Sequence, residues 1–279
     1  MPSPSHSTER AKPLLGTIVR IRVAGLPEAR AHEAISGAFC VVLDIHRLMS
    51  FHDADSELFH LNVTAFHEPV RISVHTRTVL EKALELARIS DGIFDPTIAP
   101  ALVGEGLLPC PGEENLQDPA DWRDVVLSDD GSVSFSRPLW LDFGGIAKGY
   151  AVDRAVAHLE TYGPASLCVE AGGDLRLAGP EAELVRLAAP GAGDELPVLS
   201  LENASVASSL GTAHVDTRTG AFCLADRFVS VVAPRCIDAD ALTKVVMAAG
   251  PSAAPILERY EACAFFREGA AWTQVGGSA

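Results

Sequence analysis

The sequence predicts an α+β protein built from mostly antiparallel sheets with packed helices. Segments with strand and helix periodicity follow one another without a regular βαβ rhythm, and the G-x-G-x-x-G fingerprint of a doubly wound fold is missing. Hydrophobic residues make up 48% of the 279 residues, and 23 glycines with 18 prolines imply many turns. We therefore expect a folded chain with a continuous core.

The chain divides into a short polar start and a long remainder. Residues 1–13, which are polar and contain prolines, are expected to form a flexible N-terminal arm. Residues 14–279 are expected to form a single domain, either as one body or as two lobes that meet at a ligand cleft. The segment 109–130, with its prolines and acidic residues, is expected to be a surface excursion between two halves.

Periodicity predicts the main elements in chain order. Residues 16–23 alternate between apolar and charged side chains, as a half-buried strand requires. Residues 28–49 and 77–89 carry apolar side chains at helical spacing, so we expect two amphipathic helices there. A third helix is expected over residues 146–162 and a fourth after Asp238.

The end of the chain predicts a β-hairpin. The apolar strings ACAFF and AAWTQV flank Gly269, which supplies the turn between two short strands.

Charge and cysteine content exclude several classes of protein. A net charge of −15 argues against nonspecific binding to nucleic acid or to an anionic membrane surface, because both need a basic field. Six cysteines without any C-x-x-C pair indicate reduced thiols rather than a zinc site or a disulfide scaffold. Since the sequence has no apolar signal-peptide core and no long apolar run, we expect a cytoplasmic protein without membrane insertion.

The segment from Trp140 to Tyr150 has the features of a phosphate-binding turn. Gly144 and Gly145 let the backbone approach a ligand closely, the free amides of the following helix attract an anion, and Lys148 adds a positive charge. The alternative is a tight turn into a helix with a solvated lysine.

A second glycine pair, Gly172 and Gly173, follows an apolar strand. It either admits a ligand, with Asp174 or Glu170 accepting hydrogen bonds from it, or forms a turn or bulge. Farther along, Asp240 places a carboxylate near the start of the fourth helix, with the Thr243 hydroxyl one turn later. Hard oxygens of this kind suit Mg²⁺, although an aspartate that caps a helix is the alternative.

Taken together, these segments resemble the ApbE family of FAD:protein FMN transferases from Leu14 to about Gly250. The matching strings are LLGT at 14–17, MSFHDADSELFHLN at 49–62, SDGIFDPTIAP at 90–100, LDFGGIAKGYAVD at 141–153, EAGGDL at 170–175, DTRTG at 216–220 and SVVAPRCIDADALTK at 230–244. The resemblance implies a T-fold-related, two-lobed ApbE-like fold that binds FAD and Mg²⁺ and acts on an acceptor protein.

The resemblance also implies roles for individual residues. The metal ligands that it implies are the backbone carbonyl of Gly145 and the side chain of Asp240. Thr243 is a further possible ligand on the same helix face. The catalytic positions are His214 and Asp216. The residues implied in FAD binding are Leu15, Ser50, His52, Ile93, Phe94, Asp95, Asp142, Gly144, Lys148, Gly172, Gly173 and Val215.

This chain departs from the family pattern around the expected base. The family commonly has a histidine three residues before the aspartate of its DPxTG string, where this chain has Ala213, and the usual proline is Thr217. His214 is displaced by one residue. On a strand such a shift turns a side chain to the opposite face, so His214 is either the base or points away.

Further departures concern the metal and the flavin. Lys244 stands where the family has a metal-binding threonine, so either Thr243 supplies the ligand or Lys244 puts a fixed cation near the phosphates. His52 replaces an aromatic residue near the flavin, and Glu170 replaces a common asparagine.

The leading functional hypothesis is Mg²⁺-dependent transfer of FMN from FAD to a threonine or serine hydroxyl of an acceptor protein, with release of AMP. A flavin-binding protein without transfer activity and an FAD pyrophosphatase that forms FMN and AMP are the alternatives. Magnesium and positioned cations would neutralise the charge that develops on the phosphoryl oxygens in each reaction.

Overall fold

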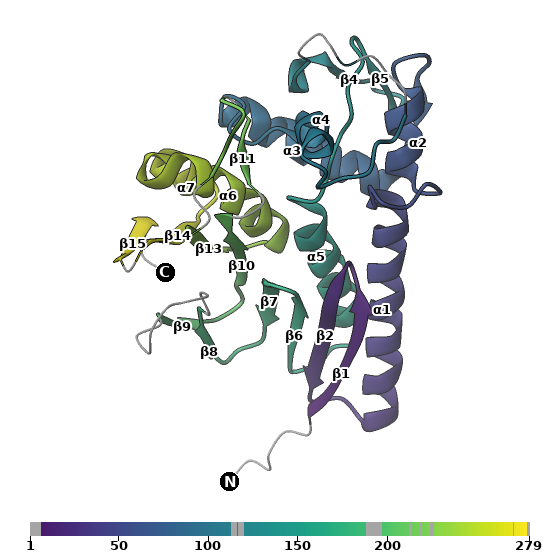
Figure 1. Ribbon diagram of the computed structural model, residues 1–279. Helices are drawn as coiled ribbons and strands as arrows, with labels where there is room; N and C mark the ends of the chain where they lie inside the picture. The colour runs from purple at the N-terminus through teal and green to yellow at the C-terminus, as the bar shows by residue number, and fades with distance from the viewer. Residues whose placement is uncertain are drawn as a thin grey trace.

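A large antiparallel sheet with helices packed against it forms the centre of the molecule (Figure 1). The computed structural model describes residues 7–112, 116, 120–187, 197–211, 214–217, 219–223, 226–269 and 271–277. Every strand pair in the described ranges is antiparallel, so the expected α+β class is confirmed.

The large sheet has eight strands in the order β1-β2-β6-β7-β10-β13-β14-β15. They are β1 (Ser7–Leu14), β2 (Thr17–Ala24), β6 (Ser166–Ala171), β7 (Asp174–Ala178), β10 (Ser205–Leu210), β13 (Phe228–Ala233), β14 (Cys263–Glu268) and β15 (Ala271–Gly276). Strand β2 confirms the alternation expected over residues 16–23, since Val19, Ile21 and Val23 are buried. Strands β14 and β15 form the expected hairpin.

The prediction of a flexible arm over residues 1–13 is wrong for residues 7–13. These residues belong to β1, which pairs with β2 from Ser7 opposite Ala24 to Leu14 opposite Thr17. Strand β1 lies at the edge of the sheet, and most of its side chains are partly or fully exposed. A polar edge strand lacks the apolar alternation by which a strand is recognised in a sequence. Residues 1–6 lie outside the described ranges.

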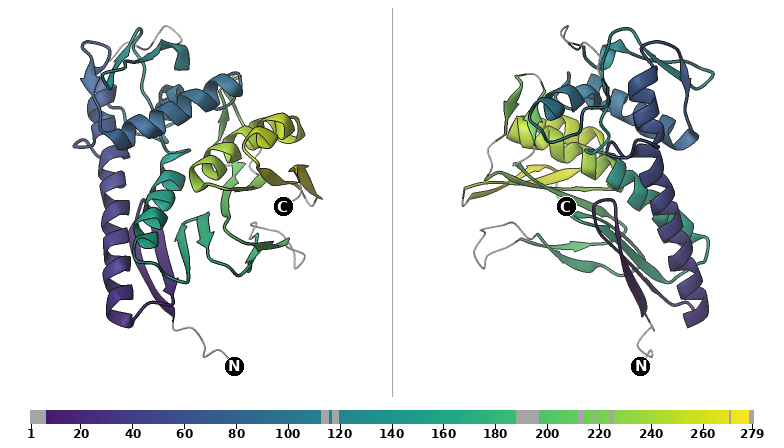
Figure 2. Two further views of the ribbon diagram at one scale, coloured as in Figure 1. Left: turned by 180° about the vertical axis from the view of Figure 1, so that it is seen from behind. Right: turned by 45° about the vertical axis from the view of Figure 1, so that its right-hand side comes forward.

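Three helices cover the same side of the sheet, as the right-hand view of Figure 2 shows. They are α1 (Glu28–Met49), α5 (Ala147–Glu160) and α6 (Cys236–Ala249). Helix α1 has the bounds expected from its apolar stripe, and it packs Ile35 and Phe39 into a core shared with β2 and α5. Full burial of such side chains stabilises the fold by roughly 1.5–3 kcal/mol each.

A second group of elements gathers at one end of α1, at the upper right of Figure 1. It contains α2 (Glu57–Thr64), α3 (Val74–Ile89), α4 (Ala99–Gly104), the short helices η1 (Pro96–Ile98) and η2 (Trp122–Asp124), and a sheet of β3 (Val70–Arg71), β5 (Ser132–Phe135) and β4 (Val125–Leu127). The expected excursion over residues 109–130 is therefore only partly irregular, because β4 pairs with β5. The core of this group is continuous with buried residues of α6.

Smaller elements complete the chain. They are β8 (Glu183–Arg186) with β9 (Val198–Leu201), β11 (Val215–Asp216) with β12 (Ala221–Phe222), η4 (Gly250–Ala253) and α7 (Ala254–Arg259). The helices expected over residues 77–89 and 146–162 correspond to α3 and α5. Helix α3 ends as expected but starts three residues earlier, and α5 starts one residue later and ends two residues earlier. Ser73 explains the earlier start of α3, because its hydroxyl caps the helix by accepting from the amide of Thr76.

Helix α6 begins two residues before Asp238, so the expected start after Asp238 is wrong. The carboxylate of Asp153, on α5, accepts hydrogen bonds from the amides of Cys236 at 3.0 Å and Ile237 at 2.9 Å. This cap comes from another helix and is invisible to local sequence patterns. Asp238 lies inside the first turn and pairs with Lys82 at 3.0 Å.

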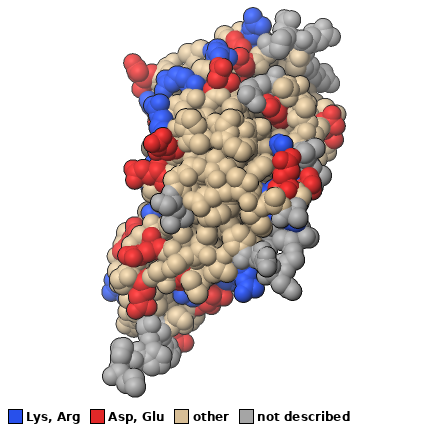
Figure 3. All heavy atoms as spheres, turned by 90° about the vertical axis from the view of Figure 1, so that its left-hand side faces the viewer, with Lys and Arg blue, Asp and Glu red and all other residues tan. Residues whose placement is uncertain are grey.

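Charged side chains gather at the margins of the face in Figure 3, and uncharged side chains fill its middle. This face therefore presents no continuous basic patch. Among the described residues, no helix is both long and apolar enough to cross a membrane.

We expect Asp153→Ala to lower the free energy of unfolding by about 1–2 kcal/mol, because two amides at the start of α6 lose their acceptor. Urea denaturation followed by circular dichroism measures this change. Asp129→Ala removes an exposed carboxylate and serves as the matched control. Equal stability of the two variants would show that the capping interaction contributes nothing.

Candidate functional site

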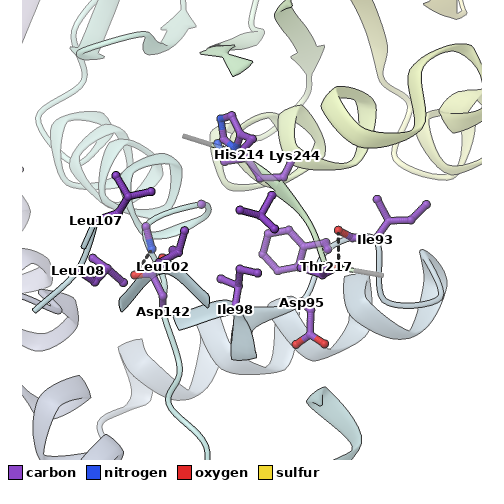
Figure 4. A pocket seen from close by; sticks show the side chains of 14 residues that line it. Ile93, Asp95, Ile98, Leu102, Leu107, Leu108, Asp142, His214, Thr217 and Lys244 are labelled. Carbon is purple, nitrogen blue, oxygen red and sulfur yellow. Dashed lines mark hydrogen bonds between the residues drawn. The ribbon is translucent and has the colours of Figure 1, made fainter. Parts of the chain in front are cut away.

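Two cavities meet at Gly144, in the turn that leads into α5. Their volumes are about 340 Å³ and about 660 Å³. The first, shown in Figure 4, is lined by Ile93, Phe94, Asp95, Ile98, Leu102, Leu107, Leu108, Asp142, Gly144, Gly145, His214, Val215, Thr217 and Lys244. The second is lined by Leu15, Gly16, His46, Met49, Ser50, Phe51, His52, Asp53, Ala54, Gly144 and Lys148. Gly144 borders both cavities, so a ligand bound over this turn would contact both linings.

Most residues expected to bind FAD lie on these two cavities, and three local structures hold them. Asp95 caps η1 by accepting from the amide of Thr97 at 2.8 Å, and burial raises the pKa of its carboxyl. Asp142 accepts from the amide of Gly144 at 3.0 Å, and burial likewise raises its pKa. Leu15 turns the chain between β1 and β2 with a positive φ of 55°.

Helices α5 and α6 touch where Gly149 faces Asp240. A Cβ atom at Gly149 would lie 2.8 Å from Cβ of Asp240 and would overlap the carbonyl oxygen of Cys236. The absence of a side chain lets the amide of Gly149 donate to Oδ2 of Asp240 at 3.1 Å. The close approach of the two helices thus brings the Gly144–Lys148 turn and Asp240 into one site.

Two lysines and two buried aspartates form a charged centre beneath the cavities. Lys148 Nζ lies 2.6 Å from Asp174 Oδ2 and 3.6 Å from Asp240 Oδ1, and Lys244 Nζ lies 3.0 Å from the same Asp240 oxygen. Burial alone raises the pKa of Asp240, but Lys148 and Lys244 outweigh it and lower the pKa to about 2. Asp240 is therefore a carboxylate at neutral pH.

The neighbouring carboxyl behaves differently. Burial and the negative charge of Asp240 raise the pKa of Asp174 to about 6, against the opposing effect of Lys148. Burial alone lowers the pKa of Lys148, but Asp240 and Asp174 raise it above its usual value, so this lysine remains an ammonium ion. Of the two acceptors considered for the second glycine pair, Asp174 pairs with Lys148 at 2.6 Å and Glu170 pairs with Arg20 at 3.0 Å.

The three residues expected to hold Mg²⁺ lie together, but the side chain of Lys244 fills the space between them. Its Nζ is 2.8 Å from the hydroxyl of Thr243, and its Cε would be 3.1 Å from a Cβ atom on Gly145. Mg²⁺ needs near-octahedral oxygen ligands at about 2.0–2.1 Å. An ammonium group already bound to Asp240 Oδ1 competes for that ligand, so this arrangement does not fit Mg²⁺.

His214 lines the first cavity and lies beside Lys244 (Figure 4). It precedes β11, so the alternation of a strand does not turn it away from the ligand. Burial, together with the positive charge of Lys244, lowers the pKa of His214 to about 3. The imidazole is therefore neutral at physiological pH and has a free lone pair for a proton. Ala213, the position of the family's histidine, lies outside the described residues.

Five expected site residues line neither cavity, and two of them, Asp240 and Thr243, are buried next to Lys244. Gly172 and Gly173 form the two-residue turn between β6 and β7, with Ala171 paired to Asp174, which is the alternative considered for this pair. Their contribution is to position Asp174. Asp216 belongs to β11, where its backbone carbonyl accepts from the amide of Gly220 at 2.8 Å.

The sequence patterns missed several cavity residues. Ile98, Leu102, Leu107 and Leu108 come from η1, α4 and the following segment, which are too short for a periodic signal. Thr217 was noted only as a replacement for proline. It donates to the backbone carbonyls of Gly92 and Ile93 and so joins the segment after β11 to the segment 90–100.

Known proteins share the sequence pattern and the fold of this chain. The ApbE family model matches residues 15–266, which is most of the chain. The chain belongs to the ApbE family. The resemblance inferred from the seven sequence strings is thereby confirmed.

Several relatives carry a named activity. An FAD:protein FMN transferase of Treponema pallidum is 28% identical over 93% of this chain and 81% of its own length. FAD:protein FMN transferases of Vibrio cholerae and Haemophilus influenzae are 27% and 28% identical. The matches to these two span 63% and 55% of this chain, and only 56% and 48% of their own lengths.

Solved ApbE structures share the fold. The ApbE protein of Thermotoga maritima has a TM-score of 0.83 at 25% identity, with 97% of each chain covered. The flavinyl transferase ApbE of Pseudomonas stutzeri has a TM-score of 0.82 at 23% identity, covering 97% of this chain and 94% of its own. The ApbE-like fold implied by the sequence is confirmed.

We expect Gly149→Ala to separate α5 from α6 and to lower the free energy of unfolding by about 1–3 kcal/mol, as overpacking does. FAD binding should weaken in parallel, because Lys148 and Asp240 move apart. Chemical denaturation and calorimetric titration with FAD measure the two effects. Gly104→Ala, at a helical glycine with open space around it, is the control.

The pKa of His214 predicts how stability depends on pH. An unfolded chain protonates His214 near pH 6.5, whereas the folded chain does so only near pH 3, so this residue destabilises the fold as pH falls between these values. Asp174, whose pKa is raised to about 6, has the opposite effect because the folded chain holds its proton longer. We expect His214→Gln to flatten the loss of stability on acidification.

Denaturation midpoints between pH 4 and pH 7 measure this slope. His32→Gln, which removes an exposed imidazole, should leave the slope unchanged. A slope that is the same in wild type and His214→Gln would contradict the burial of a neutral His214.

Proposed function

We propose that this chain transfers FMN from FAD to a threonine or serine hydroxyl of an acceptor protein and releases AMP. Membership of the ApbE family supports the proposal, as do the FAD:protein FMN transferases among its relatives. The observation that carries it is the pair of cavities that share Gly144, beside the charged centre of two lysines and two aspartates.

The diphosphate of FAD has a suitable place at this junction. The turn at Gly144 and Gly145 brings the backbone to the edge of the first cavity, and Lys244 and Lys148 line the first and the second cavity. One nucleotide half would occupy each cavity. Lys148, which is the more exposed of the two lysines, is the cation best placed to contact the phosphates.

In the transfer step, the acceptor hydroxyl attacks the phosphorus of the FMN half. A new bond forms between this phosphorus and the acceptor oxygen, the bond to the bridging oxygen breaks, and AMP leaves with that oxygen. The proton of the hydroxyl goes to His214, whose side chain lines the first cavity. Lys148 and Lys244 stabilise the charge that develops on the phosphoryl oxygens.

The expected Mg²⁺ does not enter this step. When bound, a magnesium ion would supply positive charge that neutralises the phosphates. The oxygens of Asp240 and Thr243 that would hold it are engaged by Lys244. We therefore assign the neutralising charge to the two lysines.

Hydrolysis of FAD to FMN and AMP, and flavin binding without turnover, use the same site. The position of His214 in the cavity favours a reaction over binding alone, because an imidazole at this place can take the proton of an attacking hydroxyl group or water molecule. Water and an acceptor hydroxyl compete for the same phosphorus, so only the product separates the two reactions.

The test is incubation with FAD and a candidate acceptor domain, followed by a denaturing gel viewed for flavin fluorescence. We expect a fluorescent acceptor band and an equal amount of AMP. An acceptor with its threonine or serine replaced by alanine should remain dark. AMP without a labelled band would favour the pyrophosphatase, and FAD binding with neither product would favour the carrier.

We expect His214→Ala to slow transfer by about 10²–10⁴-fold, the usual contribution of a general base, with little change in FAD affinity. Single-turnover rates and calorimetric titration measure the two quantities. His32→Ala, at an exposed site, is the control and should transfer at the wild-type rate. A wild-type rate in His214→Ala would remove this residue from the mechanism.

A further inference from the structure

We propose that the ε-ammonium group of Lys244 takes the place of a divalent cation, so that this chain binds the diphosphate of FAD without a metal ion. The inference rests on the proposed function for the identity of its ligand. It concerns the source of positive charge at the site, which the transfer reaction alone does not determine.

The geometry around Lys244 is that of a cation in an oxygen cage. Its Nζ lies 2.8 Å from Thr243 Oγ1, 3.0 Å from Asp240 Oδ1, 3.1 Å from Ser209 Oγ and 3.4 Å from the carbonyl oxygen of Asp240. Carboxylate, hydroxyl and carbonyl oxygens are the donors that a hard divalent cation prefers. Here an ammonium group occupies the centre of that set.

The packing around this cage hinders replacement of the Lys244 ammonium group by a metal ion. Asp240 and Thr243 are fully buried, and the side chain of Lys244 is only 17% exposed. The stem of Lys244 packs against Gly145, where a Cβ atom would lie 3.3 Å from Cγ and 3.1 Å from Cε. A metal ion could bind Asp240 only after this side chain had left its packed position.

The oxygens of the cage are also committed to other bonds. Asp240 Oδ2 accepts from the amide of Gly149 at 3.1 Å, and Oδ1 faces both lysines. The Thr243 hydroxyl donates to the carbonyl of Asp240 at 2.7 Å and accepts from Lys244. The hydroxyl of Ser209, 3.0 Å from that of Thr243, closes the network. This network satisfies Asp240 without a metal ion.

Lys244 also faces the ligand. It lines the first cavity together with Gly144 and Gly145, while Lys148 lines the second cavity on the other side of Gly144. Both ammonium groups contact Asp240 Oδ1, which holds them close to the start of α5. The diphosphate would therefore meet two fixed positive charges supplied by the chain.

The test is calorimetric titration of the whole protein with FAD in Mg²⁺ and, separately, in EDTA. For the wild type we expect dissociation constants that agree within about twofold. Lys244→Thr removes the ammonium group, leaves a short hydroxyl, and frees the oxygens of Asp240 and Ser209. In EDTA this variant should bind FAD at least about tenfold more weakly, and Mg²⁺ should restore much of the loss.

Mn²⁺ titration followed by electron paramagnetic resonance gives a second readout. We expect stoichiometric Mn²⁺ binding by Lys244→Thr with FAD present, and none by the wild type under the same conditions. Lys82→Thr is the matched control, because Lys82 is also largely buried beside an aspartate of α6 but lies away from the cavities. It should bind FAD like the wild type in both buffers.

A wild-type affinity that falls about tenfold or more in EDTA, or stoichiometric Mn²⁺ binding by the wild type, would overturn the inference. These wild-type measurements hold even if Lys244→Thr does not fold. Transfer activity that requires Mg²⁺ in the wild type overturns the inference but leaves the proposed function intact. If EDTA does not change the affinity for FAD and no acceptor is labelled, the inference is supported and the proposed function is rejected.

Discussion

The buried carboxylate of Asp240 connects the elements on which the site depends. One of its oxygens accepts from the amide of Gly149 on α5, and the other faces Lys148 and Lys244. An uncompensated charge in such a place costs several kcal/mol, so the carboxylate requires these partners. The same contacts hold the start of α5 against α6 and fix both lysines at the junction of the two cavities. Stability and ligand binding therefore share one set of interactions.

The two lysines supply local positive charge in a chain whose composition is strongly acidic. A chain with a net charge of −15 needs local positive charge to hold an anionic ligand. Two lysines face two aspartates, but the pKa of Asp174 is raised to about 6, so this carboxyl is the one that most easily gives up its charge. A diphosphate that approaches Lys148 shifts the balance further, because its negative charge favours the protonated form of Asp174. The centre can thus become more positive when the ligand arrives.

Periodicity revealed the elements whose burial is regular. The stripe on α1 gave both of its ends, and the alternation of β2 gave a strand with one buried face. Strand β1 could not be predicted, because an exposed edge strand has no such alternation. Its pairing with β2 is what makes it a strand. The start of α6 stayed hidden for a related reason, since its cap is Asp153 on a different helix. Both misses are tertiary interactions that override local signals.

The same contrast between local sequence patterns and tertiary contacts applies to the site. Ordered strings identified the residues around the cavities, yet their roles depend on contacts such as that between Gly149 and Asp240, which are far apart in the sequence. Residues three and four positions after Asp240 share its helix face, so the sequence could not choose between Thr243 and Lys244. The length of the side chain determines which of these two residues reaches the carboxylate of Asp240. The short Thr243 hydroxyl turns back to the carbonyl of Asp240, whereas the long Lys244 side chain reaches Oδ1, and the cation at this position is therefore part of the chain.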